Sequence, residues 1–191
     1  MGAVLNSDSV QKENPRLRKL GTLFALSGLA NAAWLFTWHY NYFGLSVLVM
    51  LTLLGLLIAS YLKLNVNRSS ASGAEWWSVD LPFSVYLGWI TIATIANLTA
   101  LLVNVNWNTW GLGEQFWAVA VIIVGIAIAL SVLFTRKDIY YCLVVDWALL
   151  GILLKRLSAT APAQSVVVIT IVGLVLITAG VIAQLIRKRA Y

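Results

Sequence analysis

The sequence has few charged residues and little of the chemistry that enzyme sites use. Only 10% of its 191 residues are charged, against about 25% in an average soluble domain. It holds one cysteine and one histidine, so Cys142 has no intrachain disulfide partner and His39 has no second His or Cys at metal-ligand spacing. No paired acid, base or nucleophile motif is present. We therefore expect no catalytic residues, no metal site and no resident cofactor.

Apolar residues dominate instead. They make up 61% of the chain, and the mean hydropathy is +0.87. Because a bilayer core of roughly 30 Å requires about 20 apolar residues in a helix, the sequence predicts an all-α integral membrane protein with a transmembrane domain over 19–187. We expect six membrane-spanning helices, at about 19–39, 43–63, 81–105, 115–134, 139–154 and 163–186.

Basic residues gather on one side of this arrangement. With six spans, both termini and two of the loops share one face, and that face holds eleven of the thirteen basic residues. Only Lys155 and Arg156 lie on the other. The positive-inside rule then places the polar segment 1–18 and the basic tail 188–191 in the cytoplasm. The charges flank spans, so we expect the lipid bilayer and no nucleic acid as partner. A multi-pass protein of a prokaryotic cytoplasmic membrane fits this asymmetry.

Aromatic and amide side chains recur at helical spacing inside two of these spans. Residues three or four apart share a helix face. On the span 81–105 this face carries Tyr86, Trp89, Ala93 and Asn97. On the span 19–39 it carries Asn31, Trp34 and Trp38. The amides either hydrogen-bond across helices as structural contacts or face a ligand, and the spacing leaves both interpretations open.

Asp146 is the one acidic residue that falls inside a predicted span. A carboxylate at the bilayer centre costs about 2.5 to 3.5 kcal/mol on the insertion scale, so it is either hydrogen-bonded for structural reasons or part of a site. Trp147 follows it directly and lies well inside the same span. Both residues are candidates for a ligand site.

Two motifs in the first half of the chain resemble known ones. An Asn-x-x-Trp with nearby aromatics lies in the first span, and a Pro-aromatic start followed by Trp-x-x-x-Ala-Thr-x-x-Asn lies in the third. Both resemble the translocator protein/tryptophan-rich sensory protein family, also called the peripheral benzodiazepine receptor family. The matching positions are Asn31, Trp34, Phe36, Pro82, Phe83, Trp89, Ala93, Thr94 and Asn97.

This resemblance covers about 40% of the chain, from Gly28 to Asn97. The family forms a five-helix bundle, whose first two helices have no counterpart here, and three further helices follow instead. The resemblance implies binding of a hydrophobic ligand such as a porphyrin or sterol, in sensing, transport or tetrapyrrole handling, and a homodimer is a further expectation. Two alternatives stay open: a small proton-coupled transporter that uses Asp146, and a structural subunit of a membrane complex.

Overall fold

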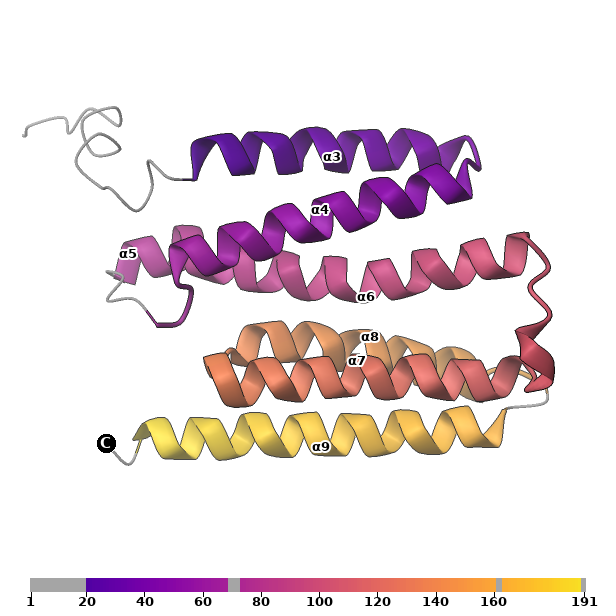
Figure 1. The fold of residues 1–191 in the computed structure, drawn as a ribbon. Helices are drawn as coiled ribbons and strands as arrows, with labels where there is room; N and C mark the ends of the chain where they lie inside the picture. Colours follow the sequence, from indigo (N-terminus) through magenta and orange to yellow (C-terminus); the bar gives the residue numbers. More distant parts are fainter. Residues whose placement is uncertain (1–19, 69–72, 161–162, 190–191) are drawn as a thin grey trace, which may run out of the picture. The chain divides into compact units, whose positions relative to one another are not determined.

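The computed structural model describes residues 20–68, 73–160 and 163–189, and within these ranges every regular element is a helix (Figure 1). The polar segment 1–18 and the last two residues of the basic tail lie outside the described residues. The chain forms two compact units that divide between Phe83 and Ser84. Each unit is described separately below.

The first unit contains a pair of long helices that pack along each other, α3 (Gly21–His39) and α4 (Phe43–Leu64). A short turn joins them (Figure 1). Met50, Leu53 and Leu57 are fully buried, and their spacing of three and four places them on one face of α4. This apolar face provides the core of the unit.

The helical backbone that leads into the third long helix begins at Gly73, earlier than the expected start at residue 81. The short helix α5 (Gly73–Glu75) and the π-helical stretch η1 (Trp76–Asp80) run directly into α6 (Leu81–Asn104). Asp80 precedes an apolar run, a position typical of a helix N-cap, but it lies inside continuous helical backbone and is buried. Pro82 has no backbone N–H, so the regular α-helical bonding pattern is interrupted next to it. A π-helical stretch is one way to absorb such an interruption.

The second unit contains α6 from Ser84 onward and three further long helices. The single-turn helix η2 (Thr109–Gly111) precedes α7 (Glu114–Arg136), α8 (Ile139–Leu157) and α9 (Gln164–Arg189). These last three pack against one another (Figure 1).

Glycines bring the helices of the second unit close together. A Cβ atom built on Gly173 would lie 2.5 Å from Cδ1 of Ile126, and one on Gly180 would lie 2.6 Å from Cδ2 of Leu133. Only a residue without a side chain permits this approach of α9 to α7 without rearrangement. Gly173 and Gly180 are therefore positions of close helix packing.

Six helices of nineteen residues or more are present in the described part of the chain, as expected, and each begins and ends within three residues of the expected range. Four helical segments are long and apolar enough to cross a membrane: Phe43–Leu64, Gly73–Asn104, Glu114–Arg136 and Gln164–Arg187. The other two long helices, α3 and α8, are not among these four, and α8 carries three charged residues within its 19.

Candidate functional site

The predicted aromatic and amide stripe lies on a single uninterrupted helix, α6. Exposure falls along it, from Trp89, which is 54% exposed, through half-buried Ala93 to Asn97, which is only 2% exposed. Tyr86, one turn before Trp89, is half-buried. A buried amide is almost always hydrogen-bonded within the protein. The burial of Asn97 therefore favours a structural role for its amide, whereas the Trp89 ring has an open face.

Asp146 lies in the middle of α8 and contacts α9. Its Oδ2 accepts a hydrogen bond of 2.9 Å from the hydroxyl of Thr178. Its other oxygen, Oδ1, is buried and has no hydrogen-bond partner among the residues that the structure describes. The next side chain, Trp147, is 70% exposed. This part of the second unit thus combines a carboxylate oxygen with unused acceptor capacity and a large aromatic ring open to its surroundings.

The first unit holds the remaining three predicted site residues, all on α3. Trp34 and Trp38 stack with ring centroids 6.1 Å apart and an angle of 27° between the planes. Trp38 also meets Phe43 at the start of α4, edge to face, at 5.5 Å. Asn31 is exposed, and the Trp34 indole N–H is buried without a partner among the described residues. The aromatic face predicted on this helix is therefore present, and its rings pack mainly with one another.

The sequence predicts nine ligand-contact residues, which fall into two groups in the structure. Three lie in the first unit and six in the second. Within the second unit, α6 and α8 approach each other closely at Gly88. A Cβ on Gly88 would lie 3.1 Å from the backbone oxygen of Tyr141 and 3.2 Å from Cβ of Val144. The predicted residues of α6 and α8 therefore lie on helices in direct contact.

A buried polar cluster at the start of α8 escaped the sequence reasoning. Asp138 caps α8 by accepting a 3.1 Å hydrogen bond from the backbone N–H of Tyr141, and the hydroxyl of Ser84 on α6 donates to its other oxygen at 2.6 Å. Asp138 is fully buried. The signal in the sequence was an aspartate between a basic turn and an apolar run, which is typical of a helix N-cap.

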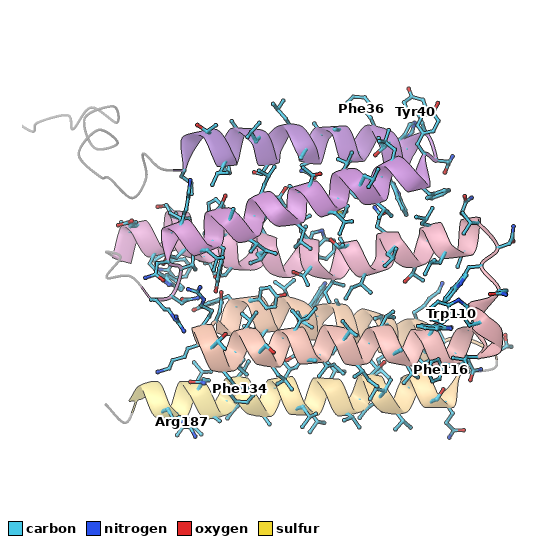
Figure 2. All side chains as sticks on the ribbon, viewed as in Figure 1. Phe36, Tyr40, Trp110, Phe116, Phe134 and Arg187 are labelled. Atoms are coloured by element: carbon cyan, nitrogen blue, oxygen red, sulfur yellow. The ribbon has the colours of Figure 1, made fainter. Side chains whose placement is uncertain are left out.

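Three tryptophans gather at the α6–α7 connection. The rings of Trp107, Trp110 and Trp117 form a cluster with centroids 4.8 to 5.4 Å apart. Figure 2 labels Trp110 and Phe116 at this end of the second unit, and Phe134 and Arg187 at its other end. Beside the cluster is a pocket of about 490 Å³. No sequence pattern indicates this pocket, because its walls come from several helices.

Comparison with known proteins gives one match. The sequence model of the family described as TSPO-like protein matches residues 2–183. The match thus includes α7, α8 and most of α9, which lie beyond the stretch whose motifs carried the resemblance. No curated protein matches significantly, and no solved structure does either.

Proposed function

The chain belongs to the TSPO-like protein family and is a multi-pass integral membrane protein, and from this premise we propose that it binds a hydrophobic, tetrapyrrole-like small molecule. Proteins of this family generally bind or transport ligands and do not catalyse reactions. We accordingly assign binding, and no catalysis, to this chain. The ligand would serve sensing or transport.

The observation that carries the proposal is the arrangement around Asp146. Buried polar atoms in native proteins are almost always hydrogen-bonded, so Oδ1 of Asp146 has acceptor capacity that a ligand donor could use. The next residue along α8, Trp147, has an exposed ring that would supply a flat apolar surface. Ligand sites in membrane bundles combine such apolar walls with a few polar groups that fix orientation. The pyrrole N–H groups of a tetrapyrrole would donate to the Asp146 oxygen, and its apolar faces would suit the Trp147 ring.

The test is a titration of the purified protein with protoporphyrin IX, followed by quenching of tryptophan fluorescence. We expect Asp146→Leu and Trp147→Leu each to raise the Kd by about tenfold, because each removes one contact of roughly 1.4 kcal/mol. Trp77→Leu is the matched control, since Trp77 is also highly exposed, at 66%, but lies in the first unit. It should leave the Kd unchanged.

The α6 stripe gives a second arm to the same titration. If the Trp89→Ala/Asn97→Ala double variant raises the Kd while the Asp146 and Trp147 variants do not, the ligand binds at the stripe and the assignment to Asp146 is wrong. If neither protoporphyrin IX nor a carotenoid quenches the tryptophan fluorescence of the wild-type protein, and a direct binding assay detects no sterol, the binding function itself fails.

The same carboxylate supports the transporter alternative. A buried ionisable residue inside a membrane helix is a common element of proton relays. In liposomes, a proton-coupled transporter would show pH-dependent flux that disappears in Asp146→Asn. A purely structural subunit would bind no ligand, and the same substitution would reduce co-purification of its partner.

We also propose that α3 and α8 complete a set of six spans with both termini in the cytoplasm. Two observations support this: both helices have 19 residues, and the basic residues divide eleven to two between the faces that six spans create. Reporter fusions after residues 68 and 158 should report opposite sides of the membrane. The prokaryotic cytoplasmic membrane and the homodimer stay predictions.

A further inference from the structure

The pocket at the α6–α7 connection is amphipathic. It lies where the apolar segment of α6 ends and that of α7 begins. Its apolar wall comes from Leu102, Val103 and Val121, and its rim carries both Glu114 and Arg156. Its volume of about 490 Å³ lies within the roughly 300 to 1,000 Å³ that small-molecule sites occupy.

The loop that forms one side of this pocket is fixed by hydrogen bonds. The indole N–H of Trp117 donates to the backbone oxygen of Thr109 at 2.8 Å, and the Asn108 side chain accepts from the backbone N–H of Trp110 at 3.1 Å. Thr109 and Trp110 have φ values of 55° and 52°, a left-handed conformation that costs side-chain-bearing residues of order 1 to 3 kcal/mol. Such strain persists where the surroundings hold it, and it concentrates at binding sites.

Glu114 and Arg156 bring opposite charges to the rim from different helices. Glu114 lies in the first turn of α7 and Arg156 in the last turn of α8. Each sign suits the helix dipole at its position, but that does not account for both charges lining the same pocket as Trp107 and Trp117. Neither side chain makes an ion pair or hydrogen bond within the described part of the chain, and both are exposed. Both charges are therefore available to a ligand.

We propose that this pocket binds the headgroup of a zwitterionic phospholipid. The ammonium group would lie between Glu114 and the faces of Trp107 and Trp117, because aromatic rings attract cations. The phosphate would meet Arg156, whose planar guanidinium binds phosphate oxygens in pairs. Leu102, Val103 and Val121 would contact the glycerol and the first carbons of the acyl chains. Helix ends rich in tryptophan are where lipid headgroups lie in a bilayer.

The test is native mass spectrometry of the full chain in detergent, titrated with phosphatidylethanolamine and with phosphatidylglycerol of the same acyl chains. We expect the first lipid to bind about tenfold more tightly than the second. Glu114→Gln should abolish this preference by weakening phosphatidylethanolamine alone, whereas Arg156→Gln should weaken both lipids. Lys155→Gln is the matched control, since its charge is adjacent but does not line the pocket, and it should change neither affinity.

Three outcomes would overturn the proposal. Equal affinity for the two lipids in the wild type would show that the ammonium is not recognised. If Glu114→Gln and Arg156→Gln bind both lipids with the same affinities as Lys155→Gln, any bound lipid lies outside this pocket. Competition by glycerophosphoethanolamine, which has no acyl chains, at the same concentration as the lipid would identify a soluble zwitterion as the occupant. Porphyrin binding at Asp146 has its own readout, so neither proposal depends on the other.

Discussion

Replacing Gly88 with leucine is expected to destabilise the second unit by about 3 kcal/mol, the upper range for forcing extra atoms into a packed interior. A Cβ at this position would lie 3.1 Å from the backbone oxygen of Tyr141. A backbone atom cannot move aside as a flexible side-chain end can, so α6 and α8 would have to separate. The free energy of unfolding, measured by denaturant titration in micelles, should fall by that amount.

Gly151→Leu is the matched control for this substitution. Gly151 lies on α8, the same helix that Gly88 contacts, but it is exposed and a Cβ there would meet nothing within 4 Å. We expect no loss of unfolding free energy at this position and a gain of up to about 1 kcal/mol, because leucine favours helical backbone more than glycine does. Equal losses for the two leucine variants would mean that α6 and α8 do not approach closely at Gly88.

The long helices could be predicted from the sequence because each depends on a continuous run of its own residues. The runs are apolar enough to require a helix in a bilayer, and polar turns such as Lys137–Asp138 mark where they end. The polar stretch 67–80 has no long apolar run, which predicts a loop between two spans. Its part from 73 to 80 is helical in the structure.

The candidate site could likewise be predicted only where a feature depends on a single helix. The spacing of Trp89, Ala93 and Asn97 is a property of one helix, and the structure confirms that they share it. Which of these side chains is buried depends on the neighbouring helices, and the sequence alone left that open. The pocket that Glu114 of α7 and Arg156 of α8 both line depends entirely on packing between helices. No local pattern connects these two residues.

The contact between Asp138 and Ser84 also joins residues far apart in the chain, and its loss should be costly. Asp138→Ala is expected to destabilise the second unit by about 2 to 4 kcal/mol. The substitution removes the cap of α8, which contributes about 0.5 to 2 kcal/mol. It also leaves the buried Ser84 hydroxyl without its 2.6 Å partner, a loss of about 1 to 3 kcal/mol. The fall in unfolding free energy, measured by denaturant titration in micelles, gives the sum of these two losses.

Two further variants separate the cap from the contact with α6. Asp138→Asn keeps an oxygen that can accept from the backbone N–H of Tyr141, since asparagine is also a good N-cap, and should lose less than Asp138→Ala. Ser84→Ala removes the donor on α6 and leaves the cap in place. In a double-mutant cycle, Asp138→Ala and Ser84→Ala should together cost less than the sum of their separate effects, because both remove the same bond. Strict additivity would show that the bond does not hold α6 against the start of α8, and that Asp138 stabilises the protein through its cap alone.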